Sequence, residues 1–179
     1  MDREINIREE RMEKVYYASF ESPWLGKVFV ASTERGVCAV DFLTSEKAFL
    51  KNLKDPFPEG AIQDHRKNEN VLLQLKKYSE GKLKKFHCRL DLRGTLFQKK
   101  VWSALMKIPY GQTRSYQEVA RTTGHPKAFR AVGNANRANP IPLIIPCHRV
   151  IESNGGLGGF GHGLKVKKQL LDFERAHVV

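Results

Sequence analysis

Residues 127–150 read KAFRAVGNANRANPIPLIIPCHRV, and two different patterns meet in this stretch. Residues 127–139 place arginines among small side chains without any acidic residue, which predicts a helix with a narrow basic face. The apolar run that follows is typical of a buried strand, and it ends at Cys147, directly before His148 and Arg149. The stretch therefore predicts a basic helix joined to a segment that delivers a thiol into a polar corner.

A second helix is predicted just upstream. SYQE at residues 115–118 is a capping box that opens a helix ending near Thr123, and Gly124-His125-Pro126 then forms a tight turn. Helix, short turn and helix in a basic region is the helix-turn-helix pattern. The alternative is a helical hairpin whose small residues let two helices approach within a core, but the lack of acids favours a phosphate-facing helix.

The rest of the chain predicts an α+β fold in two domains. Residues 15–42 alternate apolar and polar side chains as an antiparallel meander, and helical patterns follow at about 44–53 and 67–80. Another capping box, TLFQ at residues 95–98, opens a helix to about Lys107. We expect a small N-terminal antiparallel-sheet α/β domain over residues 1–92, with 1–13 flexible, and a mainly helical domain over 93–179.

Net charge is distributed unevenly between these two parts. The 179 residues carry a net charge of +12, of which +2 lies in residues 1–92 and +10 in residues 93–179. A field of this kind attracts polyanions, so nucleic acid is the first partner to consider and an anionic lipid surface the second. A basic surface that only maintains solubility is the third interpretation.

The composition argues against several other classes of protein. The three cysteines, Cys38, Cys88 and Cys147, are odd in number and lack CxxC spacing, so we expect free thiols and no metal site. GLGGFG at residues 156–161 matches a dinucleotide motif but has no βαβ unit around it, so it predicts a loop and no cofactor. Without a long apolar run or a signal-like N-terminus, a cytoplasmic protein that does not bind membranes is expected.

Reactive chemistry is most plausible at Cys147, because a thiol becomes nucleophilic as its thiolate. His148 follows directly, but adjacent side chains often diverge, so a water molecule could connect the two. Glu174, on a helix predicted over residues 164–177, and Asn139 are polar residues that could orient the pair. Spacing alone leaves open whether Cys147 is a nucleophile with its base or a core cysteine at a strand end.

Together, these motifs resemble one family. SYQEVA (115–120), KAFRAVGNANRANP (127–140), PCHRV (146–150) and LLDFE (170–174) are similar to the O6-alkylguanine-DNA alkyltransferases, also called methylated-DNA–protein-cysteine methyltransferases. The likeness is dense from about Thr95 onward and diffuse over the N-terminal domain. It implies direct reversal of DNA damage, in which O6-alkylguanine, or O4-alkylthymine, is flipped from the duplex and its alkyl group moves irreversibly to the protein's cysteine.

The resemblance also implies roles at the thiol site. Cys147 would accept the alkyl group, His148 would act as a base through water, and Glu174 would fix the histidine tautomer. Asn139 would brace the active-site segment, and Tyr116 would assist nucleotide rotation and donate to guanine N3. The carbonyls of Cys147 and Val150 would accept from the guanine amino group, and the amide of Gly161 would reach O6. The implied base-pocket residues are Val150, Gly158, Phe160 and Gly161.

DNA contact is implied for the helix over residues 127–139. Its pattern alone favours the major groove, whereas the resemblance places it in the minor groove of double-stranded DNA, with Arg130 filling the gap in the base stack. The small residues would then form a low-profile contact surface. The implied DNA-binding residues are Lys127, Ala128, Arg130, Ala131, Gly133 and Arg137.

A few positions depart from the family pattern. Gly161 stands where some relatives have serine, Phe160 replaces a tyrosine, His162 occupies a position where glycine is common, and Phe129 replaces a frequent alanine beside Arg130. The loop departures predict a poorer fit for bulky base adducts.

Other functions remain as alternatives to a monomeric alkyltransferase. A non-catalytic alkyl-lesion binding protein would lack the acceptor cysteine that is present here. A helix-turn-helix DNA-binding regulator would recognise a defined operator. A thiol hydrolase would leave the basic helices unexplained.

Overall fold

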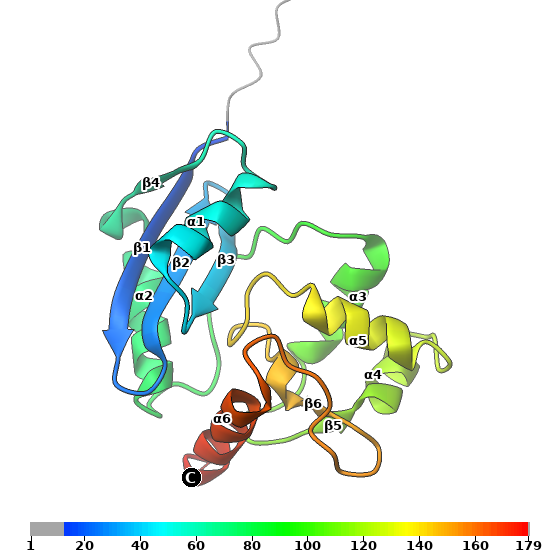
Figure 1. Cartoon of the computed structure of the whole chain (residues 1–179). Helices are drawn as coiled ribbons and strands as arrows, with labels where there is room; N and C mark the ends of the chain where they lie inside the picture. Colours follow the sequence, from blue (N-terminus) through cyan, green and yellow to red (C-terminus); the bar gives the residue numbers. More distant parts are fainter. Residues whose placement is uncertain (1–12, 179) are drawn as a thin grey trace, which may run out of the picture.

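The computed structural model describes residues 13–178 and contains two parts of different architecture (Figure 1). A sheet flanked by helices forms the N-terminal part, and helices dominate the C-terminal part, so the predicted α+β class is confirmed. The predicted flexible segment 1–13 lies, except for Glu13, outside the described residues.

The N-terminal sheet has the strand order β3-β2-β1-β4. The predicted meander consists of β1 (Val15–Ser22), β2 (Gly26–Thr33) and β3 (Gly36–Phe42), which pair antiparallel. The sheet as a whole is mixed, because the additional strand β4 (Ala61–Gln63) pairs parallel with β1. Its three residues are too few for an alternating pattern to be recognised.

One helix covers each face of the sheet (Figure 1). Phe29 and Ala31 pack in a cluster with α1 (Glu46–Lys54), whereas Val28 and Val30 point to the opposite face and pack with α2 (His65–Ser79). This division follows from the period of two along a strand. The sheet is therefore buried on both sides.

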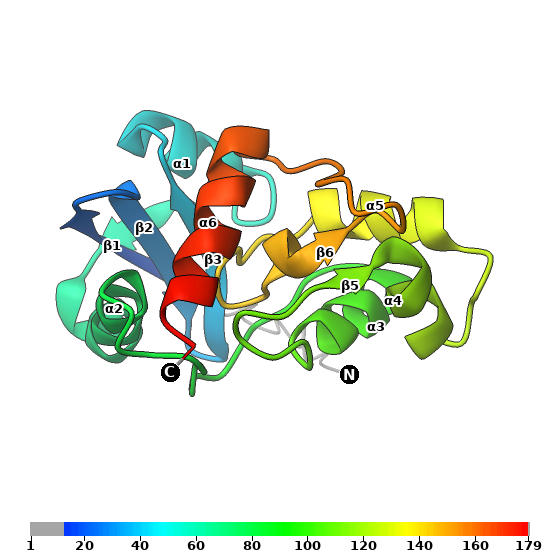
Figure 2. The same ribbon diagram turned by 90° about the horizontal axis from the view of Figure 1, so that it is seen from below.

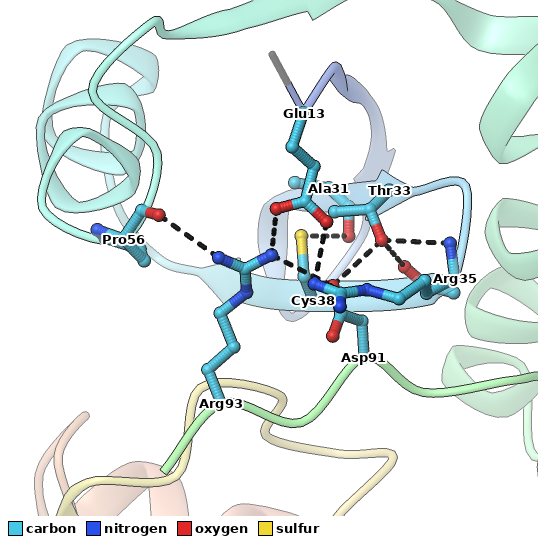
Figure 3. Close-up of polar contacts among 9 residues, drawn as sticks. Glu13, Ala31, Thr33, Arg35, Cys38, Pro56, Asp91 and Arg93 are labelled. Atoms are coloured by element: carbon cyan, nitrogen blue, oxygen red, sulfur yellow. Dashed lines mark hydrogen bonds and ion pairs between the residues drawn. The ribbon is translucent and has the colours of Figure 1, made fainter. Parts of the chain in front are cut away.

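The edge strand β3 binds the segment that joins the two parts. The amide of Val37 donates to the carbonyl of Arg89 at 2.9 Å, and the amide of Asp91 donates to the carbonyl of Val37 at 2.8 Å. Arg93 extends this attachment through ion pairs with Glu13 and Asp91. Figure 3 shows the polar residues of this attachment: Glu13, Thr33, Arg35, Asp91 and Arg93.

Cys38 lies beside this attachment (Figure 3). Its thiol is buried and donates to the carbonyl of Ala31 at 3.4 Å (Figure 3). Burial raises the pKa of the Cys38 thiol to about 12, so it is protonated at neutral pH. Cys88 is half-buried.

The C-terminal part contains the predicted helix-turn-helix, with capping boxes at Thr95–Gln98 and Ser115–Glu118. The strands β5 (Arg114–Ser115) and β6 (Val150–Ile151) pair parallel, which joins the segment after Cys147 to the start of the helix capped by Ser115. The elements are α3 (Leu96–Leu105), β5 (Arg114–Ser115), α4 (Tyr116–Thr122), α5 (Phe129–Arg137), the 3-10 helix η1 (Cys147–Arg149), β6 (Val150–Ile151) and α6 (Leu164–Ala176).

Two predictions about residues 127–150 need correction. The helix α5 begins at Phe129, because the amide of Ala128 donates to the carbonyl of His125 at 2.8 Å and closes a turn first. The apolar run before Cys147 is buried but consists of turns, not a strand. Prolines at positions 140, 142 and 146 remove strand donors, and Leu143 has a φ of 73°.

The last helix, α6, lies between the sheet and the β5–β6 pair (Figure 2). The rings of Trp24 and Phe173 pack with centroids 4.5 Å apart, which fastens α6 to the N-terminal part. Within residues 13–178, no helix is long and apolar enough to cross a membrane, and no cluster of three or more acidic, histidine or cysteine residues could hold a metal ion.

Candidate active site

Cys147 begins the 3-10 helix η1 and is 7% exposed at the floor of a cavity of about 860 Å³. The turn is fixed by its own backbone, since the amide of Cys147 donates to Ile145 at 2.8 Å and that of Arg149 donates to Pro146 at 3.0 Å. The amide of Val150 donates in turn to the carbonyl of Cys147. The thiol therefore has a defined position beneath the cavity.

Asn139 fixes the segment that leads to the thiol. Its Nδ2 donates to the carbonyl of Ile145 at 2.8 Å and to Sγ of Cys147 at 3.2 Å. Its Oδ1 accepts from the amide of Ile141 at 3.0 Å, and because that partner can only donate, the orientation of the amide group is determined. Asn139 therefore presents a donor to the sulfur.

His148 and Glu174 form a fully buried pair behind the thiol, with Nε2 and Oε1 2.8 Å apart. Nδ1 of His148 is also buried and has no hydrogen-bond partner among residues 13–178. Since the carboxylate can accept only a hydrogen carried on Nε2, Nδ1 is the unprotonated nitrogen of the neutral ring. The ring is thus held as the tautomer whose free nitrogen can accept a proton.

Glu174 collects donors from several elements. Arg149 donates to both carboxylate oxygens at 2.8 Å, the hydroxyl of Tyr78 donates to Oε1 at 2.8 Å, and the amide of Gly111 donates to Oε2 at 3.0 Å. Although burial acts to raise it, the bonds from His148 and Arg149 hold the pKa of Glu174 well below its usual range. The carboxylate is therefore ionised, and Tyr78 connects it to the N-terminal part.

The thiol of Cys147 and the imidazole of His148 are uncharged at neutral pH. Burial raises the pKa of the Cys147 thiol, and the bond from Asn139 and the charge of Lys167 oppose this change only in part. Burial lowers the pKa of His148 more strongly than Glu174 raises it. The thiol, which lines the cavity, and the fully buried imidazole are therefore both uncharged at neutral pH.

Tyr116 and a glycine-rich loop form the walls of the cavity. The hydroxyl of Tyr116 donates to the carbonyl of Gly159 at 3.4 Å. Gly158 has a φ of 65°, and a Cβ there would lie 2.8 Å from the Tyr116 ring, so only glycine permits this contact. The cavity is lined by Tyr116, Gln117, Phe129, Gly133, Asn136, Arg137, Cys147, Glu152, Ser153, Gly158, Gly159, Phe160 and Gly161.

Comparisons with known proteins agree with this geometry. A family model described as 6-O-methylguanine DNA methyltransferase, DNA binding domain, matches residues 96–176, and one described as its ribonuclease-like domain matches residues 15–92. The methylated-DNA–protein-cysteine methyltransferase of Methanosarcina acetivorans is 45% identical over 160 residues, covering 89% of this chain and 98% of the relative. The chain belongs to the methylated-DNA–protein-cysteine methyltransferase family.

Solved structures of the family have the same fold. Mycobacterium tuberculosis OGT in complex with DNA has a TM-score of 0.78 and 40% identity over 90% of this chain and 94% of that one. The O6-methylguanine methyltransferase of the same organism also has a TM-score of 0.78, with 39% identity over 91% of this chain and 94% of that one. The chain is thus a DNA-repair methyltransferase with a DNA-binding domain.

The predicted site residues of this methyltransferase separate into three groups. Cys147 and Asn139 form one hydrogen-bonded pair and His148 and Glu174 form another, and the two pairs are adjacent because residues 147 and 148 follow each other in the chain. A second group lines the cavity: Tyr116, Gly133, Arg137, Gly158, Phe160 and Gly161. The others do not line it: Lys127, Ala128, Arg130 and Ala131 lie at or near the start of α5, and Val150 is buried beneath the cavity.

Lys167 is a site residue that the sequence reasoning missed. Its buried ammonium group donates to the carbonyls of Val150 at 2.5 Å and Gly159 at 3.2 Å. Burial lowers the pKa of Lys167 to about 8. The sequence carries a signal for Lys167, because positions 167, 170, 171 and 174 form a single helical face, which also holds two leucines and Glu174.

Proposed function

We propose that this methyltransferase repairs double-stranded DNA by moving the alkyl group of O6-alkylguanine, or of O4-alkylthymine, to Sγ of Cys147. The observation that carries the proposal is the thiol at the floor of the large cavity, bonded to Asn139 and backed by the buried His148–Glu174 pair. A base must leave the stack before a thiol can reach O6, and a cavity of about 860 Å³ has room for one nucleotide base.

His148 acts as the base that ionises the thiol. Nε2 donates to Glu174, so the thiol proton is accepted at Nδ1, and a water molecule carries it between the two groups. Glu174 stabilises the imidazolium that forms. Asn139 and the ammonium group of Lys167 stabilise the thiolate.

The transfer is a displacement at the alkyl carbon. A bond forms between that carbon and Sγ of Cys147 as the bond from the carbon to O6 breaks. The electron pair of the broken bond passes to the guanine ring, which takes up one proton in place of the proton that the thiol lost. The product is a thioether, which neither His148 nor Glu174 can hydrolyse, so each molecule acts once.

Tyr116 supplies a donor to the leaving base. Burial raises the pKa of Tyr116, and Cys147 and Glu152 add to the effect, so the phenol keeps its hydrogen at neutral pH. Donation to guanine N3 lowers the charge that develops as the C–O6 bond breaks. The tyrosine already lies in the cavity wall, against Gly158 and Gly159.

Backbone groups recognise the base: Cys147 and Gly161 line the cavity, and Val150 is hydrogen-bonded to Cys147. The carbonyls of Cys147 and Val150 accept from the guanine amino group, and the amide of Gly161 donates to O6. Val150 also accepts from Lys167, which leaves one lone pair of its carbonyl oxygen for the base. Phe160 contributes an apolar wall.

DNA binds over α5 through its minor groove. The helix exposes Arg130 and Arg137, and Gly133 opens the surface above Tyr116, with no heavy atom nearer than 3.9 Å to an added Cβ. Arg130 fills the gap left by the flipped nucleotide, while Lys127 and Arg137 contact phosphates. Ala128 and Ala131 keep the contact surface low. Because every group of the relay comes from one chain, a monomer suffices.

Transfer of label from DNA to protein tests the proposal. After incubation with a duplex carrying labelled O6-methylguanine, the label should appear on the tryptic peptide spanning residues 138–149, which contains Cys147 and neither other cysteine. That peptide should be heavier by one methylene unit. Modification confined to the peptides with Cys38 or Cys88 would contradict the assignment.

Stoichiometry and a matched variant complete the test. The yield should stop at one alkyl group per protein molecule, however long the reaction runs, and sustained turnover would defeat the displacement mechanism. Cys147→Ser should abolish transfer and still bind DNA, because the basic helix does not involve the thiol. Equal loss of binding and transfer would indicate a structural cysteine.

A further inference from the structure

His162 leaves the active-site loop and binds the N-terminal part of the molecule. Its Nε2 lies 2.7 Å from Oδ1 of Asp41 on β3, and its ring stacks on the ring of Phe42 with centroids 4.0 Å apart and an interplanar angle of 8°. Phe42 is fully buried, so the ring that receives the stack is immobilised by the core. The loop is therefore fastened to a rigid strand.

The same strand also holds the other side of the thiol site. The amide of Val40 donates to the carbonyl of Pro140 at 2.9 Å, and Pro140 follows Asn139, which binds Cys147. Two consecutive residues of β3 thus make these contacts: Val40 contacts the segment that leads to Cys147, and Asp41 contacts the glycine-rich loop through His162. β3 is the edge strand nearest the C-terminal part (Figure 1), so its free edge is available for both contacts.

The part of the loop that faces the cavity lies between two anchors. Gly159 is held by Lys167 and Tyr116, and His162 is held by β3, whereas Phe160 and Gly161 between them line the cavity. His162 itself lines a separate cavity of about 320 Å³ behind the loop. Its ring centroid is 5.4 Å from that of Phe160. A shift of His162 would therefore move the cavity wall.

We propose that His162 is a positioning residue that fixes the cavity wall through Asp41 and Phe42, and that this anchor makes the site selective for small alkyl groups. The proposal rests on the proposed function, since it concerns the substrate range of the same site. When the anchor is absent, the wall moves outward and the Gly161 amide loses its fixed position. Transfer of a methyl group then slows, and transfer of a benzyl group slows less or accelerates.

Paired substrates test this selectivity. Single-turnover rates are measured with duplexes that carry O6-methylguanine or O6-benzylguanine, for wild type, His162→Ala, Asp41→Ala and the double variant. We expect each single variant to raise the benzyl-to-methyl rate ratio by about 3-fold to 10-fold, the effect of losing one hydrogen bond of ordinary net strength. The double variant should match His162→Ala, because loss of the imidazole already removes both the contact with Asp41 and the stack on Phe42.

A control separates the anchor from a general loss of stability. His65 is exposed at the first position of α2, so His65→Ala should leave the ratio unchanged. His162→Gln should restore part of the wild-type ratio, because its amide can still donate to Asp41. An unchanged ratio in His162→Ala, or effects of the two single variants that add in the double variant, would overturn the proposal.

A second measurement needs no DNA. Iodoacetamide labelling of Cys147, read from the 138–149 peptide with Cys88 as internal reference, should accelerate in His162→Ala and Asp41→Ala because the loop shields the thiol less. A wild-type chain that accepts no methyl group would overturn the proposed function. If His162→Ala and Asp41→Ala kept the wild-type labelling rate and the wild-type benzyl-to-methyl ratio, the positioning role of His162 would be overturned and the proposed function would stand.

Discussion

Replacing Tyr78 with phenylalanine removes one hydroxyl group of the N-terminal part from the His148–Glu174 pair. That hydroxyl donates to Oε1 of Glu174 at 2.8 Å, the oxygen that also accepts from Nε2 of His148. Burial raises the pKa of Tyr78 well above its ordinary value, and Glu174 adds to the effect, so the phenol is always a donor. The substitution therefore changes the number of donors on the carboxylate and little else.

The structure gives the size and direction of the effect. A hydrogen bond to a charged group contributes about 1.5–3 kcal/mol, and we expect the lower end because Arg149, His148 and Gly111 still donate to Glu174. In a chain of this size that corresponds to a Tm lower by roughly 3–6 °C. With one donor fewer, the carboxylate raises the pKa of His148, so the acid limb of the methyl-transfer rate moves to higher pH.

Tyr110 provides the matched control. Its ring packs edge-on against Tyr78 with centroids 6.1 Å apart, but its buried hydroxyl has no hydrogen-bond partner within the described chain. Tyr110→Phe should therefore leave the Tm and the pH profile unchanged or raise the Tm slightly. Thermal unfolding and single-turnover rates between pH 5 and 8 measure both quantities. If Tyr78→Phe behaved like Tyr110→Phe, the hydroxyl would have no role in the pair.

Three further predictions concern DNA and the buried lysine. Arg130→Ala should slow transfer from a paired lesion in duplex DNA far more than from the free modified base, and equal slowing in the two assays would remove the role in base flipping. Affinity for undamaged duplex, measured by fluorescence anisotropy, should fall by roughly one log unit per phosphate contacted for each tenfold rise in salt concentration. An affinity that does not change with salt would show that the basic surface does not bind DNA phosphates. The pKa of Lys167 is lowered to about 8 from 10.5, so the unfolded chain binds more protons between these values and stability rises with pH there. Lys167→Met should abolish that rise, about 2 kcal/mol between pH 8 and 10 in urea unfolding, and a rise that persists would assign it to other groups.

Patterns within short stretches of sequence predicted the secondary structure correctly in most places. The meander follows from alternation, and the starts of α3 and α4 follow from capping boxes whose reciprocal bonds form as predicted. The apolar run before Cys147 was misread because hydrophobicity reports burial and does not report conformation. Its prolines, which carried the correct information, exclude a strand at this position.

Contacts between distant residues could not be predicted in this way. Neither Tyr78 nor Asp41 lies in a motif, and each reaches the site only because the two parts pack together around α6 and β3. Lys167 is intermediate between a local pattern and a distant contact. The sequence shows the helical face on which it lies, but a lysine buried on an inward face is unfavourable unless it has hydrogen-bond acceptors, and those carbonyls are seen only in the structure. The geometry shows the proximity of Glu174 to His148, whereas the sequence offered Glu174 only as a polar residue that could orient the pair, and the family resemblance implied its role.

The neutral resting state of the thiol follows from the same burial that builds the site. A low-pKa cysteine reacts with oxidants and with any accessible electrophile, and a protein that can use its acceptor only once would be consumed by such reactions. Here burial raises the pKa of the Cys147 thiol, while the ionised Glu174 and the tautomer of His148 hold a proton acceptor ready beside it. Under the proposed function, we expect charge separation to become favourable when an alkylated base occupies the cavity and offers a carbon to the sulfur. The desolvation that makes the thiol a weak nucleophile at rest would then also make the site selective for its substrate.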